Sequence, residues 1–573
     1  MLSERRKTVT SNQRIDRRRF LAAGGVAGLG LLGVAGCGSG SVVKKNRVSG
    51  EADGAFGGAE RGSDRVARTL TSEAPLPKPF TSDLPILPTL KPTGRRGGQD
   101  LYEITQRAAD REILPGLKTS VWGYDGQFPG PTIAARRGEP IVVRMHNQLA
   151  VPTTTHLHGG ITPAASDGYP TDLTVPRGYT KRVDAAVHAM STGGGQKMAM
   201  GPTGTRPDPK VWTVHQGFKD YEYPIEQRST MLWYHDHRMD FTGPQVWRGL
   251  AGAFIVRDEQ EDKLGLPAGD KELVLVICDR AFAASGAFLY PSLDETLINH
   301  AGTKSEYTNG VMGDVILVNG APWPVAKVAN TRYRLRLLNA SNARQYSLQL
   351  HATAGEKRPP FVQIGSDGGL LAEPQRLTSI PIAQAERFDV IVDFSKYPVG
   401  TELVLTNSLD KGTTGQVMKF VVDREEKDQS TPLPKRLVPD FEVLKKSQAV
   451  TARRFDFRFN YDAKTWTING NPFDPTKSLA SPELDTVALW HLSSNANDSS
   501  HPVHMHLAHF QVISRNGHQP SLADAGWKDT VNLAPHGQVD VLVKFTGFKG
   551  RYMLHCHNLE HEDMAMMANF TVA

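Results

Sequence analysis

Near its C-terminus the chain carries His555-Cys556-His557, and this triplet limits what the surrounding segment can fold into. In a β-strand, successive side chains point to opposite faces. His555 and His557 would then face one way and Cys556 the other. Thiolates and imidazoles are both metal ligands. The triplet therefore predicts a strand with a metal centre on each side, joined by a few covalent bonds.

The spacing of two histidines around one residue recurs in three other places. A random arrangement of the 19 histidines would produce only about 0.6 such pairs in a chain this long. A lone histidine is most simply an exposed or hydrogen-bonded residue, but that interpretation fails for ten histidines in four clusters. Each pair would present two imidazoles on one strand face, where adjacent metal ions could each take one. The pairs are His156/His158, His235/His237, His504/His506 and His555/His557, and His501 and His561 lie beside them.

Short apolar runs alternate with turn residues along most of the chain. Runs rich in β-branched residues, such as 140–145, 333–338 and 539–545, are separated by Gly, Pro, Asn and Asp. Long helical periodicity is scarce, and 39% hydrophobic with 22% charged residues is typical of a globular chain. The sequence therefore predicts an all-β protein of antiparallel sandwiches.

A weak internal repeat indicates three units. Asp125-Gly126, Asn319-Gly320 and Asn469-Gly470 each suit a tight hairpin turn, and each is followed by strands of similar pattern. We place the three domains at 81–260, 265–425 and 451–573. The charged, proline-containing stretch 426–450 is predicted to be an external linker.

The N-terminus is predicted to be an export signal. Arg17-Arg18-Arg19-Phe20-Leu21 resembles a twin-arginine motif, and the apolar run that follows is short for a membrane-spanning helix. This signal, residues 1–36, ends before Cys37 in a sequence similar to a bacterial lipobox; the alternative is an ordinary cleaved signal beside an incidental cysteine. Residues 37–80 indicate a flexible tether. We therefore expect an extracytoplasmic, periplasmic-type location, with the protein anchored to the cell membrane through a lipid on Cys37.

The net charge of +6 does not indicate a nucleic-acid partner. Residues 1–36 contain seven basic and two acidic residues, so their removal would leave about +1. No stripe of lysine and arginine follows in the rest of the chain. The mature protein is expected to be nearly neutral and to bind no nucleic acid.

Cys556 narrows the choice of metal. A cysteine with two histidines and a weak, distant methionine is the blue-copper ligand set. Structural zinc would favour Cys-x-x-Cys spacing, and the three cysteines, Cys37, Cys278 and Cys556, show none. Cys278 follows an apolar run and is expected to be a buried thiol outside any disulfide.

The four histidine motifs resemble the copper-binding motifs of the multicopper oxidases, the family of laccases, spore-coat oxidases, bilirubin oxidases and copper-efflux oxidases. The resemblance covers about 120–573. It rests on four segments, which are Thr155-His156-Leu157-His158-Gly159-Gly160, Trp233-Tyr234-His235-Asp236-His237, His501-Pro502-Val503-His504-Met505-His506, and His555-Cys556-His557 through Met566.

The resemblance implies three cupredoxin-like Greek-key β-sandwich domains and four copper ions. A trinuclear cluster would lie between domains one and three, and domain two would act as a spacer. The type 1 copper ligands would be His501, Cys556, His561 and axial Met566; type 2 would take His156 and His504; the type 3 pair would take His158, His235, His237, His506, His555 and His557.

Two carboxylates match acidic positions that relatives use near the cluster. Asp167 and Glu562 would carry protons, because reducing O2 to water consumes four of them. The alternatives are a turn residue in an Asp-Gly step for Asp167 and a hydrogen bond to a ligand histidine for Glu562.

The resemblance implies a copper-dependent oxidase that uses O2. A phenol or aromatic amine would give up single electrons at the type 1 copper, as in laccases. The first alternative is a metallo-oxidase acting on Cu(I) or Fe(II) in copper tolerance, and the remote one is a non-enzymatic cell-envelope scaffold. The expected state is a monomer.

Overall fold

The computed structural model describes residues 67–180, 191–192, 196–197, 212–494 and 499–573. The predicted signal, Cys37 and the predicted tether up to residue 66 lie outside these residues. All described residues belong to one compact unit, Gly54–Ala573. No helix within the described ranges is long and apolar enough to cross a membrane.

The first third of the described chain forms two facing sheets. Alternate residues of β3, β6 and β12 meet β5, β13 and β14 in one core, which includes Ile104, Val143 and Phe254. One sheet runs β12 (Phe218–Tyr223), β6 (Ile141–Asn147), β3 (Gln99–Arg111), β2 (Gly94–Arg96), with β4 (Thr119–Tyr124) also on β3; the other runs β5 (Gly130–Arg136), β14 (Ala251–Arg257), β13 (Thr230–Asp236), β7 (Thr155–His158). Smaller elements are β8 (Asp172–Val175) with β11 (Thr213–Gln216), β9 (Ser191–Thr192) with β10 (Gln196–Lys197), η1 (Ala164–Ser166), α1 (Thr242–Arg248) and α2 (Glu259–Asp262).

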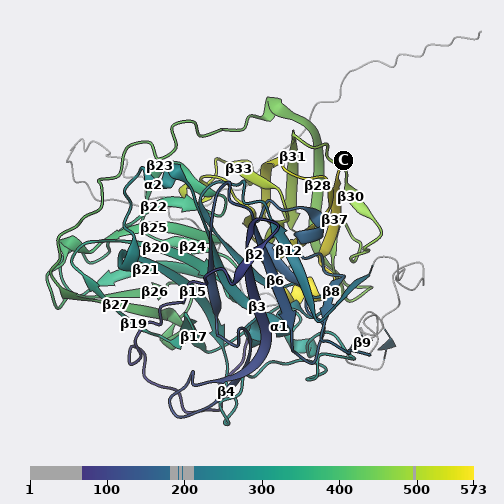
Figure 1. The fold of residues 1–573 in the computed structure, drawn as a ribbon, viewed down its shortest axis with the longest axis horizontal. Helices are drawn as coiled ribbons and strands as arrows, with labels where there is room; N and C mark the ends of the chain where they lie inside the picture. The colour runs from purple at the N-terminus through teal and green to yellow at the C-terminus, as the bar shows by residue number, and fades with distance from the viewer. Residues whose placement is uncertain (1–66, 181–190, 193–195, 198–211, 495–498) are drawn as a thin grey trace, which may run out of the picture. The chain divides into compact units, whose positions relative to one another are not determined.

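The middle third forms a second pair of sheets (Figure 1). Leu335 and Val390 of one sheet and Leu405 and Phe420 of the other belong to one apolar core. The sheets run β18 (Ala321–Pro322), β17 (Val315–Val318), β15 (Glu272–Arg280), β20 (Arg332–Asn339), β25 (Arg387–Asp393), β22 (Phe361–Ser366), β23 (Gly369–Leu377), and β19 (Val325–Ala329), β27 (Gln416–Arg424), β26 (Glu402–Asn407), β21 (Tyr346–Ala352), β24 (Ile380–Ile382). Short helical turns are η4 (Gly269–Lys271), η5 (Ser305–Tyr307), η6 (Phe394–Lys396) and η7 (Gly412–Gly415).

The last third forms a third sandwich. β35 shows why these segments are strands: its valines and Phe545 recur at every second position and are buried, with Asp540, Leu542 and Lys544 between them. The sheets run β29 (Thr465–Ile468), β28 (Ala449–Asn460), β31 (Thr486–Ser494), β35 (Gln538–Phe545), β33 (His509–Arg515), and β30 (Ser478–Ala480), β37 (Met567–Val572), β36 (Gly550–Cys556), β32 (His501–Met505), β34 (Thr530–Leu533). Helical elements are η8 (Lys446–Gln448), η9 (Leu522–Asp524) and α3 (Leu559–Asp563). The predicted all-β fold of three sandwiches is confirmed.

The three repeated turns share one backbone conformation, although Asp125-Gly126 connects β4 and β5, which lie in different sheets and form no hairpin. Asp125-Gly126, Asn319-Gly320 and Asn469-Gly470 all have positive φ at both residues. This left-handed geometry suits Asn, Asp and Gly and matches the twist of a tight hairpin. In the middle sandwich the turn joins β17 to β18, with Val318 opposite Ala321.

The structure differs from the predicted tether over residues 67–80. There β1 (Arg68–Thr69) pairs in parallel with β16 (Val311–Met312). Ser72 donates its backbone N–H to Asp314, and Ala74 is buried. The apolar residues of this stretch show no strand periodicity, and Pro75, Pro77 and Pro79 interrupt it, so the backbone pairing to the middle sandwich left no signal in the sequence. The other domain bounds stay predictions.

Candidate metal centres

Two pairs of neighbouring strands bring the four histidine motifs together. β13 pairs with β7 so that His235 lies opposite His156. β32 pairs with β36 so that His504 lies opposite His555. The side chains of all the predicted metal ligands are at most 1% exposed; these are His156, His158, His235, His237, His501, His504, His506, His555, Cys556, His557, His561 and Met566.

The first contact between the two strand pairs joins His156 to His504. Their Nε2 atoms are 3.3 Å apart. The Nδ1–H of His156 donates to the backbone oxygen of Asp167 at 2.5 Å, and that of His504 donates to the backbone oxygen of Asp529 at 3.0 Å. Burial lowers the pKa of both imidazoles, so each is neutral, and its one ring N–H is the one that Nδ1 donates to the backbone. The two Nε2 atoms therefore turn lone pairs toward each other, an arrangement that suits a cation between them.

A second pair repeats this arrangement. The Nε2 atoms of His506 and His555 are 3.2 Å apart. His506 donates from Nδ1 to the Asp167 carboxylate at 2.7 Å, and His555 donates from Nδ1 to the backbone oxygen of Cys556 at 3.1 Å. The ring of His237 stands 5.1 Å from that of His506 and 4.9 Å from that of His555, between centroids. These three rings form one donor group.

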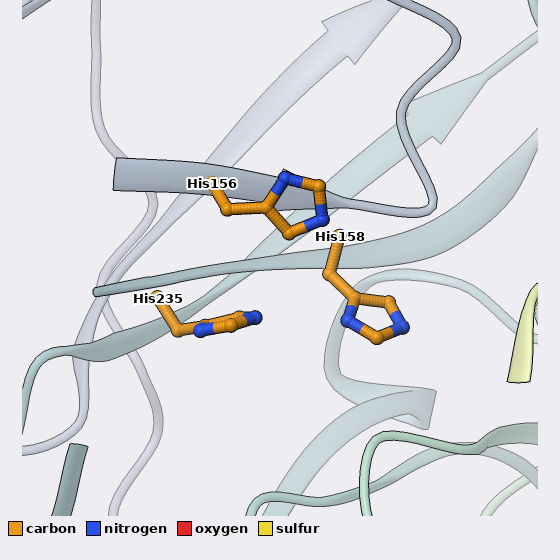
Figure 2. Close-up of side chains that lie close together, drawn as sticks. All are labelled: His156, His158 and His235. Atoms are coloured by element: carbon orange, nitrogen blue, oxygen red, sulfur yellow. The ribbon is translucent and has the colours of Figure 1, made fainter. Parts of the chain in front are cut away.

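The remaining cluster histidines are His158, His235 and His557. Figure 2 shows His158 and His235, together with His156, turned toward a common space from β7 and β13. The ring centroid of His557 lies 5.0 Å from that of His158 and 5.2 Å from that of His235. Nδ1 of His158, Nε2 of His235 and both nitrogens of His557 are buried without a hydrogen-bond partner. Unpartnered buried nitrogens of this kind fit metal ligands.

Cys556 belongs to a separate group on the other side of β36. Its Sγ lies 3.5 Å from Nδ1 of His501 and 3.6 Å from Nδ1 of His561, and those nitrogens are 3.2 Å apart. Burial lowers the pKa of His501 to about 3 and raises the pKa of the Cys556 thiol. A buried thiol that meets two neutral imidazoles fits a thiolate held by a soft metal ion.

The three nearby methionines occupy different positions. Met566 is fully buried in the same apolar core as Cys556, and its backbone oxygen accepts the Cys556 N–H at 3.1 Å. Met567 belongs instead to a small cluster with Tyr169 and Met553, and Met564 is only half-buried. Of the three, Met566 is the one that is fully buried in the core of Cys556.

Each of the two predicted acidic residues contacts two of the imidazoles. Besides His506, Asp167 holds His156 through its backbone oxygen, and its Oδ1 has no partner. Glu562 lies on α3 with Oε2 3.2 Å from Nδ1 of His555 and Oε1 3.3 Å from Nδ1 of His237. Burial by itself would raise the pKa of Glu562, but the two imidazoles outweigh it and lower the pKa to about 2.

Two residues of the site were not predicted from the sequence. The Asp529 carboxylate forms a donor group with His158 and His504. The ring of Trp466 packs on that of His561, with 3.8 Å between centroids, and its indole N–H donates to the backbone oxygen of Thr308 at 3.0 Å. Neither residue stands at a recognisable spacing from the histidines, so only the folded chain reveals these contacts.

Comparisons with known proteins agree with this geometry. Two family models, both described as multicopper oxidase, match residues 448–573 and residues 106–191 with 209–261. A protein named laccase from Bacillus stratosphericus is 33% identical, covering 85% of this chain and 98% of the relative. A bilirubin oxidase from Albifimbria verrucaria is 35% identical, covering 86% and 81%.

A solved structure extends the comparison to three dimensions. The crystal structure of a multi-copper oxidase from Pediococcus acidilactici is 30% identical, with a TM-score of 0.71, and the match covers 88% of this chain and 93% of that one. The similarity therefore covers most of each chain in sequence and in fold. This chain belongs to the multicopper oxidase family.

Proposed function

We propose that the chain is a laccase-like oxidase that takes single electrons from phenols or aromatic amines at one site and reduces O2 to water at another. The observation that carries the proposal is the position of Cys556, which meets His501 and His561 while its neighbour His555 faces the histidine cluster. Two donor groups are thus joined through a few covalent bonds. Relatives named laccase and bilirubin oxidase support an organic donor.

We propose four copper ions for these groups. The type 1 ion would be held by His501, Cys556, His561 and Met566, the type 2 ion by His156 and His504, and the type 3 pair by His158, His235, His237, His506, His555 and His557. The donor chemistry fits, because imidazole and thiolate suit copper. The facing lone pairs at 3.2 and 3.3 Å also fit, because nitrogens bound to one ion lie about 2 Å from it.

Copper bound at these groups would supply the one-electron redox chemistry and the reaction with O2. The chain orients the imidazoles through the groups that accept their ring N–H hydrogen bonds. It also excludes water, since the ligand side chains are buried. Exclusion of water protects a multi-electron reaction from side reactions.

We assign the delivery of protons to the two carboxylates. Glu562 accepts a hydrogen bond from the hydroxyl of Thr242 at 2.6 Å and faces two cluster imidazoles. Asp167 stands on the opposite side of His506 from His555. Each carboxylate could pass a proton from its Oδ or Oε atom to the space between the rings.

The donor class is tested by steady-state oxidation of a phenol, Cu(I) and Fe(II) by the copper-loaded protein, with O2 uptake as the common measurement. We expect the phenol to support the fastest uptake. Strong turnover of Cu(I) or Fe(II) with negligible phenol oxidation would assign the metallo-oxidase function instead. Absence of O2 uptake with every donor would contradict the oxidase function, and the non-enzymatic scaffold would remain as the explanation.

We also propose export by the twin-arginine signal, a lipid on Cys37 and a monomeric state. The motifs at Arg17–Leu21 and before Cys37 support the first two proposals. Fractionation of cells expressing wild type and Cys37→Ala tests the anchor, and release of the variant alone from the membrane is expected. A light-scattering mass of two chains would contradict the monomer.

A further inference from the structure

Asp529 stands between the histidine cluster and the middle sandwich. It directly precedes β34 and is fully buried. Its Oδ1 lies 3.0 Å from Nε2 of His158, and its backbone oxygen accepts Nδ1–H of His504 at 3.0 Å. The Thr530 hydroxyl donates to Oδ1 at 2.8 Å. One residue therefore holds two histidines that are assigned to different copper ions.

Arg387 holds the Asp529 carboxylate from β25 in the middle sandwich. Its Nη1 donates to Oδ1 at 2.8 Å and its Nη2 to Oδ2 at 2.5 Å. The other three N–H groups donate to the backbone oxygens of Met231, Ala385 and Asp367, at 3.0, 3.0 and 3.1 Å. All five guanidinium donors are thus satisfied. Since Met231 lies on β13, this side chain joins all three sandwiches at the cluster.

The protonation pattern around Asp529 follows from these contacts. Arg387 donates to both carboxylate oxygens of Asp529, and the Thr530 hydroxyl also donates to Oδ1, so the carboxylate is held as an acceptor. The hydrogen bond between Oδ1 and Nε2 of His158 therefore requires the proton on Nε2. Nδ1 of His158 is then the nitrogen with the lone pair, and it is buried without a partner. The backbone oxygen gives His504 the opposite tautomer, with its lone pair on Nε2.

We infer that Asp529 and Arg387 are positioning residues of the trinuclear site, and that Asp529, oriented by Arg387, selects which ring nitrogen of His158 faces the metal. The inference rests on the proposed assignment of His158 and His504 as copper ligands. It also gives the middle sandwich a role beyond spacing. A second contact also joins the third sandwich to the middle one, because Nζ of buried Lys528 lies 3.0 Å from Asp367 and 3.2 Å from Glu386.

Two variants test the inference in the full-length chain. Asp529→Asn keeps the shape but removes the charge, and Arg387→Lys keeps the charge but loses the two-pronged contact. Both are loaded with Cu(II), and copper per chain, the blue absorption, the type 2 paramagnetic signal and the near-ultraviolet type 3 absorption are measured. We expect copper affinity at the cluster to fall about 10- to 100-fold, with altered type 2 and type 3 signals and unchanged blue absorption.

Asp279→Asn is the matched control. Asp279 is equally buried and paired, to Arg344 at 2.9 Å, but touches none of the cluster histidines. It should lower the melting temperature without changing the cluster signals. Wild-type copper content and signals in both test variants would overturn the inference while leaving the proposed function intact. Wild-type protein that shows neither blue absorption nor O2 uptake would instead contradict the proposed function.

A measurement on the copper-free wild-type chain tests the inference even if both variants fail to fold. Nitrogen NMR of labelled histidines distinguishes the two neutral tautomers. We expect His158 to be protonated at Nε2 and His504 at Nδ1. The opposite tautomer at His158 would overturn the inference without reference to any variant.

Discussion

Six cluster histidines donate one ring N–H to a protein acceptor. The acceptors are two carboxylates and four backbone oxygens, and the donors are His156, His158, His235, His504, His506 and His555. Each acceptor selects a tautomer, so the free lone pair of each ring has a defined direction before a metal arrives. The orientation of the site is therefore decided one hydrogen bond at a time.

Cys556→Ser should abolish the intense blue absorption and leave the copper ions of the cluster bound. A hydroxyl does not replace the thiolate, while the cluster imidazoles lie in separate donor groups. Absorption spectra and copper content check this expectation. A variant that stays blue would contradict the type 1 assignment.

Glu562→Gln should slow reoxidation of the reduced protein by O2 while leaving the blue absorption unchanged. The amide keeps the contact with Thr242 but cannot take up a proton and pass it on as the carboxylate can. Loss of a positioned acid–base group typically costs about 100-fold or more. Stopped-flow reoxidation after anaerobic reduction measures the effect, and an unchanged rate would assign Glu562 to hydrogen bonding alone.

At the scale of elements, strand register decides which side chains meet. A shift of one residue between β32 and β36 would move His504 away from His555 and turn the alternate set of side chains to each sheet face. The turn that carries Asp167 also has little freedom to move. Gly168 has φ of +77°, and a Cβ there would lie 2.2 Å from the backbone oxygen of Thr155 on β7.

Gly168→Ala should therefore displace the Asp167 turn from β7. The positive φ alone costs about 1–2 kcal/mol for alanine, and the contact is with backbone, which cannot move aside cheaply. We expect a lower melting temperature and a loss of cluster copper with the blue absorption retained. Gly178→Ala is the control, since its φ is +79° and its Cβ would meet nothing. Equal copper loss in both variants would contradict the role of the close contact.

At the scale of the whole molecule, buried ion pairs join the first sandwich to the middle one. Glu261 on α2 binds Arg334 and Arg336 of β20, and Glu272 on the neighbouring strand β15 binds Arg336 within the middle sandwich. Burial alone would raise the pKa of Glu272, but Arg336, Arg334 and Arg257 outweigh it and lower the pKa to about 2. The ionised carboxylate therefore stabilises the folded state relative to the unfolded chain.

Stability of the copper-free protein should fall with acid because of these pairs. A depressed carboxylate pKa contributes stability that is present above the unfolded value of about 4.5 and is lost as the pH falls from there to about 2. Urea unfolding at pH 7, 5 and 3 checks the expectation. Glu272→Gln should be less stable at pH 7 and show a shallower decline below pH 4.5, and an equal decline would contradict it.

Removal of copper should destabilise the whole molecule. The cluster holds β7 and β13 of the first sandwich against β32 and β36 of the third, and the facing nitrogens at 3.2 and 3.3 Å repel without a cation. Binding to the folded state alone contributes about 2.7 kcal/mol per site at 100 times the dissociation constant. Calorimetry of chelated and refilled protein should show a lower, then restored, melting temperature. An unchanged melting temperature would contradict metal binding between the sandwiches.

Much of the fold could be predicted because its signals are local. Alternating apolar residues predicted strands, and Asn-Gly and Asp-Gly predicted turns whose positive φ is confirmed. The ordered structure of residues 67–80 was not predicted, because backbone pairing to β16 requires no apolar pattern. The candidate ligands could be named because the spacing of two histidines around one residue is visible in the sequence, although His237, His506 and His557 lie directly after the last residue of their strands.

By itself, then, the sequence determined the strands, the turns and the residues able to bind metal, because these depend on neighbours along the chain. Only the tertiary structure decided which of them meet. His158 and Asp529 are 371 residues apart, and Arg387 reaches Asp529 across 142. Such contacts follow from how three sandwiches pack, and no spacing in the sequence encodes the direction of a lone pair.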